Sequence, residues 1–388
     1  MGVMKSSCSS TPSRRHRGVE GFLLRHVDAG DWPGATYAFG PAAHHPRYAG
    51  AVGCAALEPR KRSAREDGLY DLASLTKALF TAPIVLRLVE RGVLDLDTPV
   101  DAWLQEWPTS EVAAPSIREM MTHRAGFPAW LPLYREAACP GSVIEAIARS
   151  RLDRLTRGEN AARRSEYSCL GPIVVGVLLE RVTGRGLRTL LHRELRRPLG
   201  VDEKALDFGP VAADRLDGVA PTEAGRRAEA KLAGCAFERR PPFLGTVHDG
   251  NADFLGGAAG NAGLFGTASA VFRVASAMLL HGDWLTDESR RMLHSASPSP
   301  SADRDDLELR TFGLVSGADP SAPAGAFGPQ SCGHVGFTGT SIWLSPEERS
   351  VAVLLSNRVH PEDREDAPMQ RLRSRYHDLV AECLRSGA

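Results

Sequence analysis

Hydrophobic residues recur at spacings of three and four through much of the chain, a pattern typical of helices that bury one face. The pattern begins with Val19, Phe22 and Leu23, which predict a first helix. It then predicts helices over the segments 74–91, 116–122, 142–149, 170–183, 267–281 and 364–385. Gly92 and Gly184 follow two of these segments, where glycine commonly ends a helix. The middle of the chain is therefore expected to be largely helical.

Strand signals lie toward the two ends of the chain. Short runs of small, β-branched and aromatic residues occupy 34–40, 50–57, 310–315, 333–344 and 350–356. This order predicts an α+β fold in which both chain ends build one antiparallel sheet around an inserted helical region. Residues 205–262 are rich in Gly, Pro and short polar residues, and so long a stretch without regular structure is expected to form the wall of a cleft.

One large domain behind a short tail is the expected organisation. Residues 1–17 are polar, basic and Ser-rich, which predicts a disordered tail. Residues 18–388 are expected to form a single catalytic domain, with sheet parts over about 18–70 and 305–388 and a helical part over about 71–304. No apolar run near the start is long enough for a signal peptide. We expect a cytoplasmic location for the sequence as written, and a periplasmic one if the true start differs.

Composition narrows the range of partners. The 388 residues include 47 Lys plus Arg and 47 Asp plus Glu, and a net charge of zero disfavours a nucleic-acid partner. Five of the basic residues are Lys, so a Lys at any given position is unusual. The seven Cys form no CxxC pair, which fits neither a disulfide framework nor a structural zinc site. We expect a small-molecule substrate, no nucleic-acid or membrane partner and no metal, while the oligomeric state stays open.

The sharpest chemical signal is Ser74-Leu75-Thr76-Lys77 at the start of a helical segment. Residues three apart share one helix face, so the Lys77 amine can reach the Ser74 hydroxyl. The start of a helix also stabilises negative charge that develops on the Ser74 oxygen. A serine nucleophile needs an adjacent base of this kind, although a Ser-x-x-Lys spacing arises by chance in about half of such chains. We expect Ser74 to be the nucleophile and Lys77 its base, with burial lowering the pKa of Lys77.

Two further polar positions follow in the chain. Tyr167 lies in the turn before the predicted helix 170–183, from where its phenol can shuttle protons; a Tyr that only packs in the core is the alternative. His334-Val335-Gly336 opens a late strand, where Gly lets a substrate approach the backbone and His offers a polar group. For His334 alone, an edge-strand His near a bulge is the commoner explanation.

Taken together, Ser74-x-x-Lys77, Tyr167-Ser168-Cys169 and His334-Val335-Gly336 resemble the motifs of the serine β-lactamases and penicillin-binding proteins, which carry SxxK, then YxN or a variant, then KTG or HTG. The likeness is nearest the class C β-lactamase type, including its esterases and DD-peptidases, and covers roughly residues 18–385. Further matches are 89–97, 122–126, 220–223, 247–252 and 356–361. The resemblance implies a five-stranded antiparallel sheet flanked by helices, with an inserted helical subdomain.

The resemblance also implies the chemistry of the site. A covalent acyl-enzyme would form on Ser74, with Lys77 and Tyr167 as the other catalytic residues and the backbone N–H groups of Ser74 and Phe337 as the oxyanion hole. The implied substrate-binding residues are Cys169, His334, Val335 and Gly336. No metal or organic cofactor is required. The implied substrate is a small ester, amide or D-amino-acid peptide.

Two departures from the family pattern change the expected selectivity. Cys169 stands where relatives usually have Asn or Asp, and His334 replaces the Lys of KTG. Both changes weaken polar contacts to a lactam, so an esterase or DD-peptidase is expected rather than an efficient β-lactamase. Two alternatives stay open: a non-catalytic or slow penicillin-binding or sensor protein of the same fold, and an acyltransferase or cyclase that uses the same acyl-enzyme.

Overall fold

The computed structural model describes residues 15–108, 113–156, 165–223, 243–296, 309–323, 325–362 and 367–387. Most of the expected N-terminal tail, residues 1–14, lies outside these ranges. The described strands are β1 (Gly34–Pro41), β2 (Tyr48–Ala56), β3 (Arg62–Ser63), β4 (Tyr70–Asp71), β5 (Leu206–Phe208), β6 (Leu264–Gly266), β7 (Val315–Ser316), β8 (Cys332–Val335), β9 (Ser341–Ser345) and β10 (Ser350–Ser356).

Helices fill the middle of the chain, as the apolar periodicity predicts. The α-helices are α1 (Arg17–Asp28), α2 (Ala82–Glu90), α3 (Ile117–Met121), α4 (Leu133–Glu136), α5 (Val143–Thr156), α6 (Leu170–Thr183), α7 (Leu187–Leu190), α8 (Arg197–Leu199), α10 (Gly250–Phe254), α11 (Ala268–Leu279), α12 (Asp287–His294) and α13 (Ala367–Ser386). The described residues also form two π-helical turns, η1 (Lys77–Thr81) and η4 (Leu191–Arg196), and four 3-10 turns, η2 (Val100–Ala102), η3 (Pro140–Ser142), η5 (Ala213–Gly218) and η6 (Gly325–Phe327).

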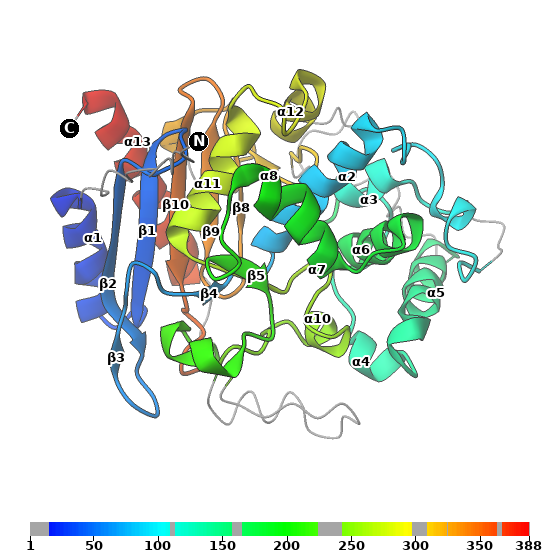
Figure 1. The fold of residues 1–388 in the computed structure, drawn as a ribbon, viewed down its shortest axis with the longest axis horizontal. Coiled ribbons are helices and arrows are strands. Elements are labelled where there is room, and N and C mark those ends of the chain that lie inside the picture. The colour runs from blue at the N-terminus through cyan, green and yellow to red at the C-terminus, as the bar shows by residue number, and fades with distance from the viewer. Residues whose placement is uncertain are drawn as a thin grey trace, which may run out of the picture.

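Seven strands form one antiparallel sheet in the order β3-β2-β1-β10-β9-β8-β7 (Figure 1). The five longer strands come from the two chain ends, as predicted, and β1 joins them by pairing Ala35 with Ser356 of β10. β3 and β7 have two residues each and extend the sheet beyond the expected five strands. Figure 1 shows this sheet on one side of the molecule and most of the shorter helices on the other.

Helices cover both faces of the main sheet. In β10, Val351, Val353 and Leu355 belong to the core on the side of α11, whereas Ala352 and Leu354 belong to the core beneath α1 and α13. Side chains alternate between the two faces of a strand, so a strand covered on both sides reads as one continuous apolar run. This explains why the sequence SVAVLLS carries no polar alternation.

Three predicted boundaries were wrong. The expected strand 310–315 is reduced to β7, with Arg310 in an isolated bridge to Val315. The expected strand 333–344 is broken by a turn in which Gly339 has φ 113° and donates from its N to Gly336 O at 3.1 Å. The stretch 205–262 contains β5, η5 and α10, while its residues 224–242 lie outside the described part.

A small second sheet, ordered β4-β6-β5, lies where the chain passes from the main sheet to the helical region. Asp71 of β4 pairs with Phe265 of β6, and Leu72 N donates to Leu264 O at 2.8 Å. These bonds fix the chain just before Ser74. The candidate nucleophile is therefore held at the junction of the sheet and the helices.

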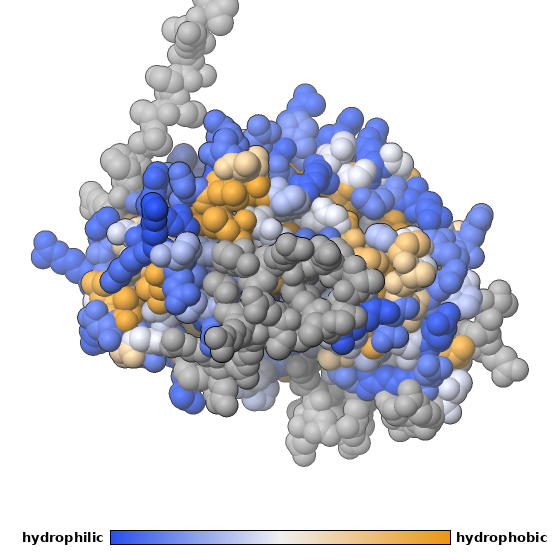
Figure 2. Space-filling model, turned by 90° about the horizontal axis from the view of Figure 1, so that it is seen from below, coloured by the Kyte–Doolittle hydropathy of each residue, from blue (hydrophilic) through white to orange (hydrophobic). Residues whose placement is uncertain are grey.

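The described surface is mostly hydrophilic on the face drawn in Figure 2, where hydrophobic residues gather in separate patches. Among the described helices, none combines the length and the apolar composition that a membrane-spanning helix needs.

Candidate active site

Ser74 lies in the turn immediately before a helix that begins at Leu75 and continues through η1 and α2. This turn brings the Lys77 Nζ within 2.8 Å of the Ser74 Oγ, the contact that their spacing predicts. Ala73, just before the serine, has φ 47°, a conformation that non-glycine residues rarely adopt. Its backbone N donates to the Asp71 Oδ1 at 2.8 Å. The buried Asp71 carboxylate therefore supports a strained turn beside Ser74.

The Lys77 amine is buried and lies near three hydrogen-bond acceptors. Its Nζ is 2.8 Å from Ser74 Oγ, 3.5 Å from Cys169 Sγ and 3.0 Å from the Asn261 carbonyl oxygen. Three acceptors match the three N–H donors of an ammonium. Burial lowers the pKa of Lys77, but Cys169, Tyr167 and Asp249 together raise it by more, so the pKa lies above its ordinary value. The expected lowering of this pKa is wrong, because polar neighbours outweigh burial.

Tyr167 lies three residues before α6, and its ring is surrounded by polar groups. The Lys77 Nζ is 5.2 Å and the Arg310 Cζ 5.0 Å from the ring centroid, and the His123 ring is 4.7 Å away. Burial raises the pKa of Tyr167, and the positive charge of Lys77 opposes this without cancelling it. At neutral pH the phenol is therefore protonated and can donate a proton.

Cys169 is the N-cap residue of α6, and its backbone N donates to Ala129 O at 2.9 Å. Its Sγ accepts from the Lys77 Nζ at 3.5 Å, as the side-chain oxygen of an Asn at this position would. A thiol offers no amide N–H, however, so the substrate side of this position loses a donor.

His334, in β8, is buried beside the Tyr167 ring, with their centroids 5.9 Å apart. Its Nδ1 lies 2.8 Å from Val335 O, and because a carbonyl oxygen only accepts, Nδ1 must carry the proton. The Nε2 is buried, and no hydrogen-bond partner for it occurs among the described residues. Burial, reinforced by the charges of Lys77 and Arg310, lowers the pKa of His334 to about 3. The imidazole is therefore neutral at pH 7.

Two threonine hydroxyls join the turn between β8 and β9 to the segment that precedes the candidate nucleophile. Thr338 Oγ1 donates to Asp71 O at 2.7 Å, and Thr340 Oγ1 donates to Leu72 O at 3.1 Å. Gly336 packs into the same junction, where a Cβ would lie 2.1 Å from Thr340 Oγ1 and 2.7 Å from Leu72 O. Only glycine fits there without displacing the backbone. The two segments that are expected to supply the oxyanion hole are thus joined directly.

One cleft of ≈ 910 Å³ connects these groups. The predicted site residues that line it are Ser74, Tyr167, Cys169, His334, Val335, Gly336 and Phe337, whereas Lys77 lies behind Ser74. The cleft is also lined by Trp130, Tyr134, Glu223, Phe243, His248, Asp249, Arg310 and Arg373, among others. The structure therefore brings together residues from both chain ends and the helical region.

Sequence reasoning missed two arginines near His334. Arg310 and Arg373 both line the cleft, and the charge of each lowers the pKa of His334. The Arg373 guanidinium also donates to Gly336 O at 2.5 Å. In a chain this rich in Arg no local signal marks either residue. Without a Lys at position 334, positive charge beside β8 is expected to be missing. Arg310 and Arg373, which lie outside β8, supply it.

The segment 247–252, one of the matches to the family pattern, forms a loop that is bonded to the chain just before Ser74. The His248 backbone N donates to Asp71 Oδ2 at 2.7 Å, and Asn261 Nδ2 donates to Asp249 Oδ1 at 3.2 Å. Through Asn261, whose carbonyl accepts from Lys77, this loop helps to position the lysine. No group of three or more His, Cys, Asp or Glu side chains suited to a metal ion occurs among the described residues.

Comparison with known proteins identifies the family. A family profile described as Beta-lactamase matches residues 28–375. This chain belongs to the β-lactamase family. Among curated relatives, an Escherichia coli O157:H7 protein provisionally named D-alanyl-D-alanine carboxypeptidase is 28% identical over 310 residues, which cover 75% of this chain and 69% of that protein.

Similar solved structures confirm the fold. EstCE1, described as a hydrolase with promiscuous acyltransferase activity, superposes with a TM-score of 0.68 and 20% identity over 93% of this chain and 98% of its own. The octameric penicillin-binding protein homologue from Pyrococcus abyssi gives a TM-score of 0.68 at 18% identity over 96% and 77% of the two chains. The expected β-lactamase/transpeptidase-like α+β fold is therefore confirmed.

Proposed function

We propose that this member of the β-lactamase family is a serine hydrolase that forms a covalent acyl-enzyme on Ser74 and acts on a small ester, amide or D-amino-acid peptide. The observation that carries the proposal is the 2.8 Å contact of the buried Lys77 Nζ with the Ser74 Oγ, at the edge of a ≈ 910 Å³ cleft. The names of the Escherichia coli relative and of EstCE1 support this substrate range.

Acylation begins when the Ser74 Oγ attacks the substrate carbonyl carbon. Its proton passes to Lys77 in those molecules in which the amine is neutral, because an ammonium cannot accept a proton. Tyr167 donates its phenol proton to the leaving group as the bond to that group breaks, and Lys77 returns a proton to the phenolate. The backbone N–H groups of Ser74 and Phe337 stabilise the oxyanion. Water then attacks the acyl carbonyl, and the reverse proton path releases the acid.

Within this class, we infer that esters and D-amino-acid peptides are better substrates than β-lactams. A substrate carboxylate that faces His334 meets a neutral imidazole instead of a charged donor. Cys169 offers no amide N–H to the carbonyl of an acylamino group. Arg310 and Arg373 supply positive charge from other directions, so a carboxylate bound here would be oriented differently from one held by a Lys in β8.

Acyl transfer is the second candidate, because the structurally similar EstCE1 is described as having that activity. In that case an alcohol or amine, in place of water, attacks the acyl-enzyme. The remaining alternative, a non-catalytic sensor, requires that the adduct on Ser74 persist.

Labelling with a fluorophosphonate tests the proposal. The probe should modify Ser74 in the wild-type protein, and Ser74→Ala should abolish both labelling and hydrolysis of p-nitrophenyl acetate. Ser321→Ala is the matched control, because Ser321 lines the same cleft but its hydroxyl donates to Asp319 Oδ1 at 2.6 Å. Lys77→Arg should remove most of the acylation rate, because a guanidinium stays protonated.

The outcomes separate the candidates. Labelling with turnover in water supports a hydrolase, and turnover that requires an added alcohol supports an acyltransferase. A stable acyl adduct without turnover in either condition supports a sensor. Hydrolysis that survives Ser74→Ala would show that the proposed nucleophile is wrong.

A further inference from the structure

Tyr167 lies on a stretch of irregular backbone, three residues before α6 begins at Leu170. In the mechanism proposed above its phenol gives a proton to the leaving group, so the position of the phenol sets the rate of that step. A side chain on irregular backbone keeps one position only when neighbouring groups hold it there. His123, which the mechanism does not use, contacts the chain on both sides of Tyr167.

His123 uses both its main chain and its side chain for these contacts. Its carbonyl oxygen accepts from Glu166 N at 3.0 Å, and its Nδ1 accepts from Ser168 N at 3.2 Å. The imidazole also packs against the Tyr167 ring, with centroids 4.7 Å apart and planes at 50°. One residue therefore bonds to both sequence neighbours of Tyr167 and contacts its ring.

The contact with Ser168 requires that the Nδ1 of His123 carry no proton. His123 is buried, and burial, reinforced by the charges of Arg310 and Lys77, lowers its pKa well below the ordinary value. The imidazole is therefore neutral at pH 7, with its proton on Nε2. The Nδ1 acceptor thus stays available at the pH at which the enzyme would be assayed.

The backbone at His123 would suit glycine better than histidine. His123 has φ 57° and follows α3, which ends at Met121. His123 N donates to Met120 O at 3.2 Å and Arg124 N donates to Glu119 O at 2.7 Å, the paired bonds of a Schellman motif, in which glycine usually takes the position of His123. A strained non-glycine residue next to a candidate active site indicates that its side chain has a role beyond the turn.

We propose that His123 is a positioning residue for Tyr167, holding the backbone on both sides of it so that the phenol reaches the leaving group. This inference rests on the acyl-enzyme mechanism proposed above. A displacement of about 1 Å can lower a rate roughly 100-fold. The p-nitrophenolate ion leaves without a proton, whereas the more basic phenolate needs one. Displacement of Tyr167 should therefore slow phenyl acetate more than p-nitrophenyl acetate.

Three variants of His123 separate the acceptor, the ring and the turn. Asparagine tolerates positive φ, and its Oδ1 lies as many bonds from Cβ as the Nδ1 of histidine. Phenylalanine keeps a ring without an acceptor, and glycine suits the turn but offers neither. The measured quantity is the leaving-group ratio, which is kcat/KM for phenyl acetate divided by kcat/KM for p-nitrophenyl acetate. His123→Phe and His123→Gly should lower this ratio roughly 10- to 100-fold, and His123→Asn less than about threefold.

His360→Phe is the matched control. His360 is also buried, and its Nε2 accepts from the backbone N of Leu57 at 3.0 Å, but it does not line the cleft. The variant should leave the leaving-group ratio unchanged. His123→Gly removes the backbone strain, so it still provides the test if His123→Phe does not fold.

Tyr167→Phe shows whether the effect of His123 passes through the phenol. Tyr167→Phe alone should lower the leaving-group ratio, and adding His123→Phe or His123→Gly should change it less than about twofold further, because the two residues act on one step. Effects that multiply in the double variants would overturn the inference, as would a wild-type ratio in His123→Gly or a ratio in His123→Asn as low as that in His123→Gly.

Failure of the underlying mechanism has a different signature. In that case Ser74→Ala would retain hydrolysis of both esters, or Tyr167→Phe would keep the wild-type leaving-group ratio. A ratio that falls in Tyr167→Phe but stays at the wild-type value in the His123 variants rejects the positioning role of His123 alone.

Discussion

Replacing Thr340 by Val tests how the proposed oxyanion hole is positioned. The Thr340 Oγ1 donates to Leu72 O at 3.1 Å, two residues before Ser74. Valine keeps the shape of the side chain but places a methyl carbon where the hydroxyl was. A carbon and a carbonyl oxygen normally approach to about 3.3–3.6 Å, so the turn that carries Phe337 should move away from the nucleophile by a few tenths of an ångström.

The expected effect falls on catalysis more than on stability. Complete loss of an oxyanion donor lowers kcat roughly 100- to 1,000-fold, and a displaced donor should cost less, so we expect kcat for p-nitrophenyl acetate to fall roughly 10- to 100-fold with little change in KM. Leu72 O keeps its hydrogen bond from the Leu75 N at 3.0 Å. The loss of unfolding free energy should therefore be about 1 kcal/mol.

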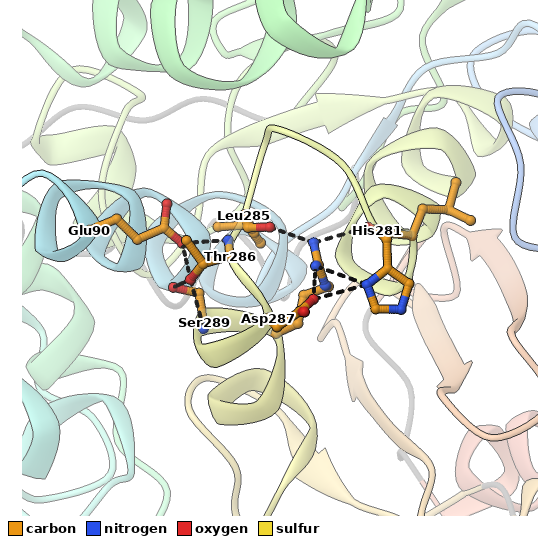
Figure 3. A network of polar contacts seen from close by, with 8 residues as sticks. Glu90, His281, Leu285, Thr286, Asp287 and Ser289 are labelled. Carbon is orange, nitrogen blue, oxygen red and sulfur yellow. Dashed lines mark hydrogen bonds and ion pairs between the residues drawn. The ribbon is translucent and has the colours of Figure 1, made fainter.

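Two further variants make the result decisive. Thr340→Ser keeps the hydroxyl and should restore most of kcat. Thr286→Val is the stability control: Thr286 caps α12 by accepting from Ser289 N at 3.2 Å and donates to Glu90 Oε1 at 2.9 Å, in a network outside the cleft (Figure 3). It should lose about 1 kcal/mol without loss of kcat. A Thr340→Val enzyme with the wild-type kcat, or a Thr340→Ser enzyme as impaired as Thr340→Val, would refute the reasoning.

Three other predictions concern protonation and charge. The pKa values of Lys77 and Tyr167 both lie above their ordinary values, so the acylation rate should rise about tenfold per pH unit from about pH 6 to about pH 8. Stopped-flow burst kinetics measure this rate. A rate that levels off in this range would contradict the conclusion that Lys77 and Tyr167 are both protonated before the substrate reacts. Burial lowers the pKa values of His334 and His377 to about 3 each, so between about pH 6.5 and pH 3 the unfolded chain binds more protons than the folded one. As the pH is lowered through this range, the free energy of unfolding measured in urea should therefore decrease by up to about 1.4 kcal/mol per pH unit for each histidine. The variant His377→Asn should reduce this slope. The variant His334→Lys should have a lower melting temperature, because a third positive charge would join two guanidinium charges that already lie beside this position. For the same reason it should raise kcat/KM for a chromogenic cephalosporin, relative to p-nitrophenyl acetate, by less than about tenfold.

The parts of the fold and site that depend on local spacing were predictable from the sequence. The segment 170–183 matches α6 because its apolar spacing reflects the face that the helix buries. The Ser74 to Lys77 contact follows from a three-residue spacing within one turn. The position of Tyr167 beside Lys77 followed from its place before that helix, together with the family resemblance.

Contacts between segments far apart in the chain were not predictable in this way. The hydrogen bond from Thr338 to Asp71 joins residues 267 positions apart, and the Asn261 carbonyl that accepts from Lys77 is 184 positions away from it. No periodicity encodes such pairs, because they exist only when the sheet and the helical region pack together. The direction of the Lys77 pKa shift was mispredicted for the same reason. The motif predicts that Lys77 is buried, but it does not predict the polar neighbours whose effect on the pKa outweighs burial.

The charges around Tyr167 explain why a neutral residue suits position 334. Lys77 and Arg310 both lie near the face of the Tyr167 ring, and Arg373 donates to Gly336 O just beyond His334. A lysine at 334 would add a fourth cation to a buried cluster, where like charges repel strongly because little water screens them. A neutral imidazole avoids this repulsion while His334 still lines the cleft. The positive charge that a Lys at position 334 would place in β8 is therefore supplied beside the cleft by Arg310 and Arg373.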